Sequence, residues 1–534
     1  MPENSATTRR TEHHDVVIAG AGPNGLMLAA ELALAGHRPV VLESLAEPST
    51  EPKANGLIGQ VVRLLDMRGL YREFTGSPEP PRPLPAYMFS GLPLSFTEVP
   101  DNPLHAWGIP QPRLVRLLHR WTRGLGVEVR WRHRLADLVP GPDAVTLTID
   151  GPDGVHTLTT GYLIGADGGR STVRKLAGIG FPGTTVTDEV TRIAHISLPE
   201  GLRDTDGGLR VPGLGPVPFG HSRHEGGTFA FAELEAGRPL LVTTEYHEPD
   251  EPTAQPMTLP EMRASVRRVL GTDLPFDAPG GPGPHALRRT VGQNTRQAEH
   301  YRAGRIFLVG DAAHVHSAMG GPGLNLGLQD SMNLGWKLAA ELDGRAPADL
   351  LDTYHEERHP VGARVMMSSL AQTALQRPGP EVTALRSLLA ELLAQPRTTA
   401  RIAGLLAGAD TRYDIGDTHP LAGHLVPDAE LVTATGPGRI AELLHAARPV
   451  LLDFGGGDIA ASATGWRDRV DLVHATANAA PVRALLIRPD GYVAWATDDP
   501  APGGEGLPTA LTRWFGPPAT VADTARTLSA RPAR

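Results

Sequence analysis

The stretch DVVIAGAGPNGLMLAAELALAG, residues 15–36, decides how the N-terminal part of the chain folds. Residues 15–19 are mostly apolar, as in a short buried strand, and residues 26–35 are rich in Leu and Ala, as in a helix. Between them, Gly20-Ala21-Gly22-Pro23-Asn24-Gly25 has the spacing G-x-G-x-x-G. In such a turn we expect Gly20 to permit the sharp bend and Gly22 to let a diphosphate approach the backbone. Gly25 is expected to let the helix pack closely on the strand.

An acidic residue completes this unit. A second strand, residues 39–42, ends at Glu43, which lies 18 residues beyond Gly25, the last glycine of the turn. A carboxylate at this place can bind both hydroxyls of an adenosine ribose, and it favours a free 2′-hydroxyl over a 2′-phosphate. The unit therefore predicts a site for FAD or NAD rather than NADP.

A second informative segment is RIFLVGDAAHVHSAMGGPGLNLGLQDSMNLGWKLA, residues 305–339. Residues 305–309 are typical of a buried strand, and Asp311 stands where that strand ends, in place to accept hydrogen bonds from a sugar hydroxyl. The loop Gly320-Gly321-Pro322-Gly323 leaves the backbone uncovered before a long helix. The N-terminal end of that helix can stabilise negative charge on a phosphate or on a reduced, anionic ring.

A third strand of the same kind, residues 162–166, leads into Asp167-Gly168. Three strands that each end in a Gly/Asp turn, in this order, resemble the signature of the group A FAD-dependent aromatic monooxygenases, the para-hydroxybenzoate hydroxylase type. The marks are the G-x-G-x-x-G turn, the "DG" turn at Asp167-Gly168 and the "GD" turn at Gly310-Asp311. The resemblance spans about residues 14–395. It is nearest to the enzymes that oxidise polycyclic aromatic polyketides and related antibiotics.

The resemblance implies where FAD is held. The family has a Gln-x-Arg, here Gln111 and Arg113, that contacts the ribityl-diphosphate arm, although both residues could instead only cap a helix. Many relatives carry Arg where this chain has Lys53, which keeps the charge but loses the planar fork. The cofactor-binding candidates are Gly20, Gly22, Pro23, Gly25, Glu43, Lys53, Gln111, Arg113, Asp167, Asp311, Gly321, Gly323, Leu324 and Asn325. The Pro322-Gly323 loop is expected near the C4a edge of the flavin.

The patterns predict an α/β protein with a Rossmann-like FAD domain, an antiparallel-sheet substrate domain and a thioredoxin-like C-terminal domain. Residues 14–180 form the first part of the FAD domain. Residues 181–290 alternate apolar and polar positions, as in an antiparallel sheet. Residues 291–405 return to the FAD domain and continue as a helical linker. Residues 418–534 resemble the thioredoxin-like domain of longer family members, but without a CxxC pair its role is expected to be structural or in assembly.

Composition narrows the class of protein. The chain has 534 residues, a formal net charge of −9 and no cysteine. Disulfides and Cys-ligated metals are therefore excluded, and nucleic acid and membranes are not expected partners. His314 and His316 lack a nearby third ligand, so we expect them to bond loop backbone and predict no metal. The polar start of the chain favours a cytoplasmic location, and the expected state is a monomer or homodimer.

No protein-borne nucleophile is evident, so the chemistry is expected to come from the cofactor. The resemblance implies non-covalent FAD, NADPH or NADH as a transient reductant, and O₂. It further implies hydroxylation of a polycyclic aromatic polyketide through a flavin C4a-hydroperoxide. The alternatives are a Baeyer–Villiger monooxygenase acting on a polyketide ketone or quinone, and a flavin oxidase or dehydrogenase. A flavin halogenase and a flavin-binding sensor are further alternatives. The Trp-x-Trp-x-Ile-Pro sequence of the halogenases is absent, and residues 107–110, Trp-Gly-Ile-Pro, match only part of it.

Overall fold

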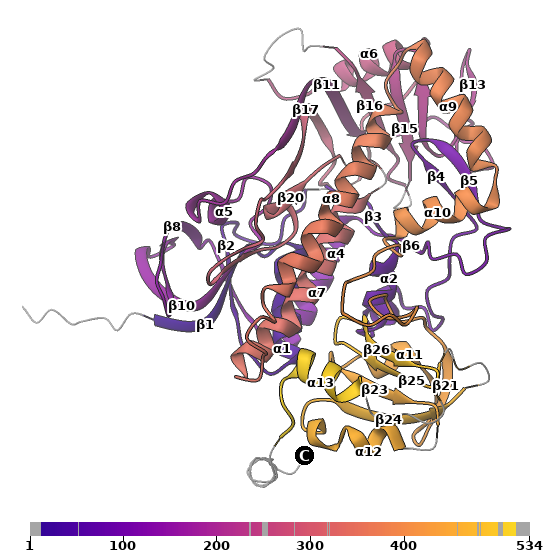
Figure 1. Ribbon diagram of the computed structural model, residues 1–534. Coiled ribbons are helices and arrows are strands. Elements are labelled where there is room, and N and C mark those ends of the chain that lie inside the picture. Colours follow the sequence, from indigo (N-terminus) through magenta and orange to yellow (C-terminus); the bar gives the residue numbers. More distant parts are fainter. Residues whose placement is uncertain are drawn as a thin grey trace, which may run out of the picture.

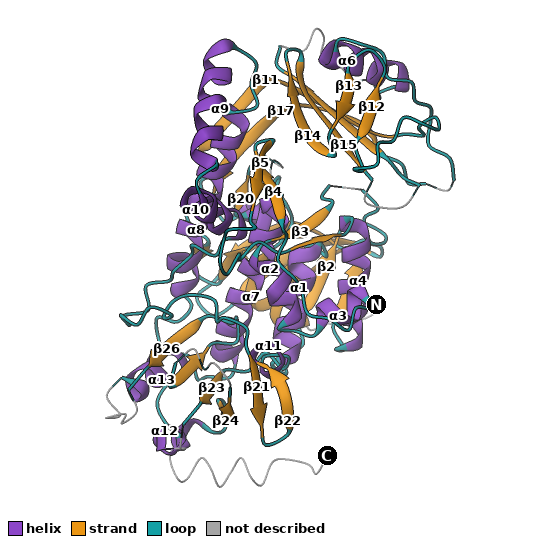
Figure 2. Cartoon of the chain, turned by 90° about the vertical axis from the view of Figure 1, so that its right-hand side faces the viewer, coloured by secondary structure: helices purple, strands orange, loops and turns teal. Residues whose placement is uncertain are grey.

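The computed structural model describes residues 12–51, 53–233, 237–247, 255–281, 283–317, 319, 321–455, 458–477, 480, 482–499 and 506–519. In these ranges the fold is mixed α/β, with one eight-stranded and two six-stranded sheets (Figures 1 and 2). Pro52, Ala318 and Gly320, which belong to sequence segments discussed above, lie outside the described residues.

The first part of the chain builds most of the eight-stranded sheet. Its elements are β1 (Glu12–Ala19), α1 (Pro23–Leu34), β2 (Val40–Glu43), β3 (Gly56–Ile58), α2 (Gln60–Asp66), α3 (Leu70–Thr75), β4 (Ala86–Phe89), β5 (Leu92–Ser95), β6 (Ala106–Gly108), α4 (Gln111–Gly124), β7 (Glu128–Trp131), β8 (Arg134–Pro140), β9 (Val145–Gly151), β10 (Gly154–Gly165) and α5 (Thr172–Leu176). Helix α1 begins at Pro23, earlier than the predicted residue 26, because the fixed φ of proline suits the first helical position.

The middle of the chain forms an antiparallel sheet with the order β14-β15-β16-β11-β17-β20, in which β20 is the short strand His314–Val315. Its elements are β11 (Gly183–His195), β12 (Leu209–Val211), β13 (Gly215–Val217), β14 (Gly220–His224), β15 (Gly227–Ala232), β16 (Leu240–Glu245), α6 (Leu259–Leu270) and β17 (Leu287–Gln297). Helix α6 covers one face. Strand β17 continues past residue 290 to Gln297, and β20 joins the same sheet, so the sheet extends beyond the predicted range 181–290.

The chain then returns to the first sheet and continues as long helices. The elements are β18 (Arg302–Ala303), β19 (Ile306–Leu308), the 3₁₀ turn η1 (Gly310–Ala312), β20 (His314–Val315), α7 (Pro322–Leu342), α8 (Thr353–Ala374), α9 (Pro380–Leu393) and α10 (Pro396–Ala407). The expectation that Pro322 and Gly323 lie in a loop is wrong. They form the first turn of α7, again because proline suits the start of a helix.

The C-terminal part has a sheet of its own with the order β22-β21-β24-β23-β25-β26. Its elements are β21 (Glu430–Thr433), β22 (Gly436–Arg439), α11 (Ile440–Leu443), β23 (Val450–Asp453), α12 (Asp458–Ser462), η2 (Thr464–Trp466), β24 (Asp471–Thr476), β25 (Ala484–Ile487), β26 (Val493–Thr497) and α13 (Leu507–Phe515). Strands β23 and β24 are parallel, whereas β25 and β26 are antiparallel. This is the thioredoxin-like arrangement.

Buried charges join the C-terminal domain to the helices of the first domain. The guanidinium of Arg488 donates to both carboxylate oxygens of Glu357 on α8, at 2.6 and 2.8 Å. Asp490 accepts hydrogen bonds from Asn333 and Trp336 of α7, each at 3.1 Å. All of these side chains are buried. The two domains therefore pack as one unit rather than as separate bodies on a linker.

No helix in the described part of the chain is long and apolar enough to cross a bilayer.

Candidate functional site

The three sequence motifs follow strands that lie side by side in the eight-stranded sheet. The parallel order is β19-β10-β1-β2. Ala19 is in register with Gly165 and with Leu42, and Gly165 is in register with Leu308. Because these residues end or nearly end their strands, the turns that follow them meet at one edge of the sheet.

The glycine-rich turn after β1 is closely packed at two positions and open at a third. Gly20 has φ +110°, and a Cβ there would lie 2.4 Å from the carbonyl oxygen of Ala166, in the turn after β10. A Cβ on Gly25 would lie 2.0 Å from the carbonyl oxygen of Gly20. A Cβ on Gly22 would meet nothing within 4 Å. The backbone at Gly22, at the N-terminus of α1, is thus accessible to a ligand.

The turn after β19 packs directly on this first turn. Gly310 has φ +60°, and a Cβ there would lie 1.8 Å from the side-chain amide nitrogen (Nδ2) of Asn24. The Ser331 hydroxyl, from α7, donates to the Asn24 carbonyl oxygen at 2.9 Å. The G-x-G-x-x-G and GD turns, far apart in sequence, therefore form one continuous surface.

Two carboxylates lie at this edge. The Asp311 side chain is exposed to solvent, yet desolvation by the surrounding protein raises the pKa of its carboxyl, against the opposing charges of His314 and Lys53. The Asp311 carboxyl thus reaches solvent although protein atoms surround it closely. Glu43 accepts the Ala21 N–H at 2.8 Å and the Leu45 N–H at 2.9 Å. Glu43, at the end of β2, thus stabilises the glycine-rich turn through the hydrogen bond to Ala21.

The Asp167 carboxylate, in the DG turn, accepts hydrogen bonds mainly from the backbone that directly follows it. One carboxylate oxygen accepts the N–H groups of Thr172 and Val173, at 2.7 and 3.1 Å, at the start of α5. Its other oxygen is buried and has no hydrogen-bond partner in the described structure. The first oxygen thus holds the start of α5, while the second oxygen can accept a hydrogen bond from a ligand or a water.

The N-terminus of α7 is held in place by Asn325. Its side-chain oxygen accepts the Ile58 N–H at 2.8 Å, and its amide nitrogen donates to the Gly321 carbonyl oxygen. Leu324 packs partly buried against the core. A Cβ on Gly323 would lie 3.4 Å from the His316 ring, which therefore packs against the start of α7. Burial lowers the pKa of the His316 imidazole to about 4, so this ring is neutral near pH 7.

The remaining candidates lie around the start of α4. The Gln111 N–H donates to the Ala54 carbonyl oxygen at 2.8 Å. Lys53 is exposed and lies 3.5 Å from the Glu51 carboxylate. Arg113 is exposed and lines a cleft together with Arg116. The structure thus places Gln111 beside the Lys53 segment, while the Arg113 side chain faces the cleft.

Sequence reasoning missed a buried ion pair behind the GD turn. Asp330 of α7 accepts hydrogen bonds from His314 Nε2 and Arg358 Nε, each at 2.7 Å, and from the Gly310 N–H at 3.3 Å. His314 therefore pairs with the Asp330 carboxylate, whereas the sequence had predicted that His314 would hydrogen-bond to loop backbone. His316 does contact backbone, with Nδ1 2.8 Å from the Ser317 carbonyl oxygen. The available signal was Asp330 itself, the first acidic residue of α7.

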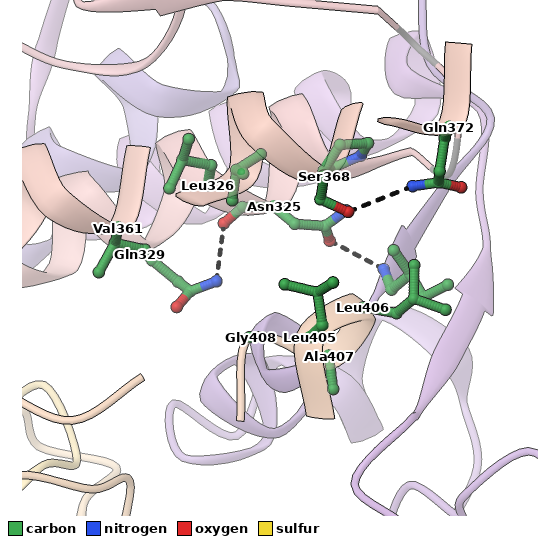
Figure 3. Close-up of a pocket in the computed structure, with 13 residues that line it drawn as sticks. Asn325, Leu326, Gln329, Val361, Ser368, Gln372, Leu405, Leu406, Ala407 and Gly408 are labelled. Carbon is green, nitrogen blue, oxygen red and sulfur yellow. Dashed lines mark hydrogen bonds between the residues drawn. The ribbon is translucent and has the colours of Figure 1, made fainter. Parts of the chain in front are cut away.

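A second, mostly apolar pocket adjoins the N-terminus of α7 (Figure 3). Pro322 and Asn325 line it from α7, and Leu405 and Leu406 line it from α10. Its polar groups bond to one another, as in the 3.2 Å hydrogen bond from the Gln329 amide to the Asn325 carbonyl oxygen.

Among the residues described, no cluster of three His, Asp or Glu side chains could hold a metal ion.

Comparison with known proteins agrees with this geometry. Residues 13–369 match the FAD binding domain family, and residues 419–518 match the C-terminal domain of aromatic-ring hydroxylases. The chain is 43% identical over 518 residues to the 12-dehydrotetracycline 5-monooxygenase/anhydrotetracycline 6-monooxygenase of Streptomyces rimosus, covering 95% of this chain and 99% of that protein.

Two solved structures are similar along nearly the whole chain. The anhydrotetracycline hydroxylase OxyS of Streptomyces rimosus superposes with a TM-score of 0.83 at 41% identity, covering 95% of this chain and 100% of OxyS. CabE, an aromatic hydroxylase from angucycline biosynthesis, gives a TM-score of 0.82 at 39% identity, covering 95% and 99%. The chain belongs to the FAD-binding aromatic-ring hydroxylase family, and it is a flavin-dependent monooxygenase.

Proposed function

We propose that this enzyme hydroxylates a polycyclic aromatic polyketide, using FAD, NADPH or NADH, and O₂. The observation that carries the proposal is the registered set of strand ends, which brings the G-x-G-x-x-G, DG and GD turns to one edge. The substrate class is supported by the relatives named for anhydrotetracycline and for an angucycline pathway. Bound FAD supplies the oxygen-activating chemistry, and the protein supplies position, charge and exclusion of water.

The residues at this edge fit FAD. We assign the open backbone at Gly22 and the start of α1 to the diphosphate, and Glu43 to the adenosine ribose. Gln111, Arg113, Lys53 and Asp311 are assigned to the ribityl-diphosphate arm. The start of α7 at Gly321–Asn325, with its positive dipole end, is assigned to the isoalloxazine, where it stabilises negative charge. The remaining candidates, Gly20, Pro23, Gly25 and Asp167, shape this surface.

We assign the antiparallel sheet, residues 181–290 with the remainder of β17, to the substrate. Along β16 and residues 190–195 of β11, the residues that face α6 are buried, and the alternate residues are half-buried. On this second face lie Ile193 and Val242, together with Thr191 and Thr244, whose hydroxyls are 3.0 Å apart. Such a mixture of apolar and hydroxyl groups suits an aromatic ring system that carries oxygen substituents. The FAD domain then comprises residues 14–180 and the returning segment 291–405, and residues 418–534 form the C-terminal domain.

Incorporation of ¹⁸O tests the proposed reaction. A panel of tri- and tetracyclic phenols and quinones is screened for compounds that stimulate NAD(P)H oxidation, and the active compound is converted under ¹⁸O₂. One labelled oxygen on an aromatic carbon supports hydroxylation. Label within a lactone would establish the Baeyer–Villiger alternative, and NAD(P)H consumption without any label in the product would establish an oxidase.

The two close glycine contacts and the open glycine predict opposite effects of the same substitution. Gly25→Ala places a methyl group 2.0 Å from the Gly20 carbonyl oxygen, so we expect the apoprotein to lose at least about 1–3 kcal/mol of stability. Gly22→Ala meets no protein atom, so we expect stability to change by less than about 0.5 kcal/mol while FAD retention falls. Thermal unfolding and flavin content of both variants check this. Full flavin content in Gly22→Ala would show that the diphosphate lies elsewhere.

The two edge carboxylates are expected to hold the cofactor. Asp311→Ala and Glu43→Ala each remove a charge-assisted hydrogen bond to FAD, which costs on the order of 1.5–3 kcal/mol, or about ten- to hundredfold in affinity. Equilibrium titration of apoprotein with FAD measures the change. Asp153→Ala, in an exposed turn between β9 and β10, is the control that loses a carboxylate away from the site. Unchanged affinity in both test variants would remove these residues from the cofactor contacts.

We also propose a cytoplasmic location and a monomeric or homodimeric state. Subcellular fractionation tests the location, and light scattering of the purified protein tests the molecular mass.

A further inference from the structure

We propose that Glu189 recognises a phenolic hydroxyl of the aromatic substrate and accepts its proton, so that this residue determines which phenols the enzyme hydroxylates. The inference rests on the proposed function and deepens it, because it assigns one side chain of the antiparallel sheet to one group of the substrate. Glu189 belongs to β11, the strand that also carries Thr191 and Ile193 on the face assigned to the substrate.

An irregularity in β11 positions Glu189. Val186 pairs with Gln293 and Val190 pairs with Val291, so β11 is longer than β17 between these two pairs, and the register shifts. Such bulges bend a strand and re-aim its side chains, and they are frequent next to active sites. Since successive side chains of a strand alternate between its faces, Glu189 shares a face with the residue two positions further on, Thr191.

Glu189 is a buried carboxylate without a cation of its own. The residue is only 8% exposed, and in the described part of the chain it forms no ion pair. Arg377, whose charge acts on Glu189, donates instead to both oxygens of Asp188, at 2.9 Å each. Because a buried carboxylate is costly unless it is paired, buried acids without a partner are rare. A substrate hydroxyl that donates to Glu189 would supply the missing partner.

Gln293 of β17 connects Glu189 to the flavin side of the site. With its amide oriented to pair with both neighbours, Gln293 donates to Glu189 Oε1 at 3.0 Å and accepts the Ser317 N–H at 2.7 Å. The Ser317 hydroxyl also donates to this amide oxygen, at 2.9 Å. Ser317 lies in the segment between β20 and α7, whose start we assign to the isoalloxazine. One glutamine side chain therefore fixes the position of Glu189 relative to that segment.

The second carboxylate oxygen of Glu189 is available to a ligand. Among the described residues, no group donates a hydrogen bond to Oε2. Burial raises the pKa of the Glu189 carboxyl, while Arg377 opposes this rise and Asp188 adds to it. Tyr246 of β16 also faces Glu189, whose charge helps to raise the pKa of the tyrosine hydroxyl. A carboxylate whose pKa is raised is a stronger base towards a phenol.

The proton transfer is simple to write. The O–H bond of the phenol breaks, the proton binds Glu189 Oε2, and the electron pair remains on the phenolate oxygen. A phenolate is richer in electrons than a phenol at the carbons ortho and para to its oxygen, and these carbons are the ones that an electrophilic oxygen attacks. Glu189 would thus select substrates that carry a hydroxyl next to, or opposite, the carbon that is oxidised.

Binding of alizarin, 1,2-dihydroxyanthraquinone, to the FAD-loaded enzyme tests the inference without turnover. This tricyclic phenol absorbs at longer wavelength once a hydroxyl has lost its proton. At a pH at which free alizarin is neutral, we expect the wild-type enzyme to bind it with the spectrum of the phenolate. Glu189→Gln should bind alizarin on the order of ten- to hundredfold more weakly, with the neutral spectrum and with unchanged FAD content.

Two controls isolate the contact between carboxylate and hydroxyl. Glu225→Gln, in the exposed turn between β14 and β15 of the same sheet, should change neither the affinity nor the spectrum. The dimethyl ether of alizarin has no proton to donate, so the wild-type enzyme and Glu189→Gln should bind it equally.

The pH dependence of turnover gives a second readout, which a merely structural role would not produce. With a phenol that the wild-type enzyme converts, Glu189→Gln should lower kcat by about 10²-fold or more near pH 7. Activity of this variant should recover as the pH rises towards the pKa of the free phenol, because the substrate then arrives already deprotonated.

Three results would overturn the inference. One is that wild-type enzyme does not bind alizarin as the phenolate, and another is that Glu189→Gln has the same affinity and spectrum as wild type. The third is that Glu189→Gln loses FAD or thermal stability without a change in its pH profile, which would assign the carboxylate to the fold. Failure of every phenol in the panel to stimulate NAD(P)H oxidation by wild-type enzyme would instead contradict the proposed function itself.

Discussion

Arg488→Met is expected to lower the free energy of unfolding by about 3–5 kcal/mol, because it leaves two buried carboxylates without their main cation. The Arg488 guanidinium is fully buried, bonds both Glu357 oxygens and also contacts Asp490. The Cζ atom of its guanidinium lies 4.6 Å from the centroid of the Trp514 ring, so packing is lost as well. Denaturant unfolding, followed by tryptophan fluorescence and by flavin release, measures the loss.

Two comparisons separate the buried pair from a general effect of lost charge. Arg448→Met removes an arginine from an exposed pair with Asp471 in the same domain, and should cost no more than about 1 kcal/mol. Arg488→Lys keeps the charge but loses the planar fork, so it should fall between the two. A loss as small for Arg488→Met as for Arg448→Met would contradict the view that these charges join the domains.

Stability in acid should depend on the same cluster. Burial opposes ionisation of Glu357, but Arg488 and Lys337 outweigh it and lower the pKa of its carboxyl from 4.5 to about 2. A carboxyl whose pKa is lower in the folded chain stabilises the fold fully above pH 4.5, and this contribution is lost as the pH falls towards 2. Glu357→Gln should therefore flatten the dependence of unfolding free energy on pH between 4.5 and 2.

Asp330→Asn is the second substitution with a large expected effect. It keeps the shape of the side chain but leaves Arg358 buried without its carboxylate, which should cost about 3–5 kcal/mol. Because Asp330 also accepts the Gly310 N–H and pairs with His314, the GD turn should shift and FAD should bind more weakly. Thermal unfolding of the apoprotein and FAD titration measure the two effects separately.

A double variant shows whether the Asp330 charge acts through Arg358. Replacing a whole buried ion pair by residues of similar size is often nearly neutral, whereas breaking it is costly. Asp330→Asn combined with Arg358→Met should therefore regain a substantial part of the stability lost in Asp330→Asn alone. Strictly additive losses would mean that the aspartate stabilises the fold by another route.

The local part of the site could be predicted from the sequence. The strand, glycine-rich turn, helix and Glu43 form a short contiguous pattern, and the structure places Gly20 and Gly25 in the close contacts that such a turn requires. The first residues of α1 and α7 were misplaced because a proline inside a glycine-rich run was read as loop, whereas it starts each helix.

Long-range polar contacts could not be predicted. Glu357 and Arg488 are 131 residues apart, and neither periodicity nor composition shows that they meet. Asp330 lies in a helix that the sequence predicted, but its partners His314 and Arg358 come from β20 and α8. The cleft at the start of α4 depends on how the antiparallel sheet is placed against that helix, which no single segment encodes. Packing of distant elements thus determined the parts that sequence patterns missed.

Titration of purified apoprotein with FAD tests the central claim most directly, namely that three separate strand ends form one flavin site. The predicted result is saturable uptake of one FAD per chain, released intact on denaturation, with a yellow flavin spectrum that NADPH bleaches in the absence of O₂. A colourless chain that takes up no FAD under these conditions would contradict the account.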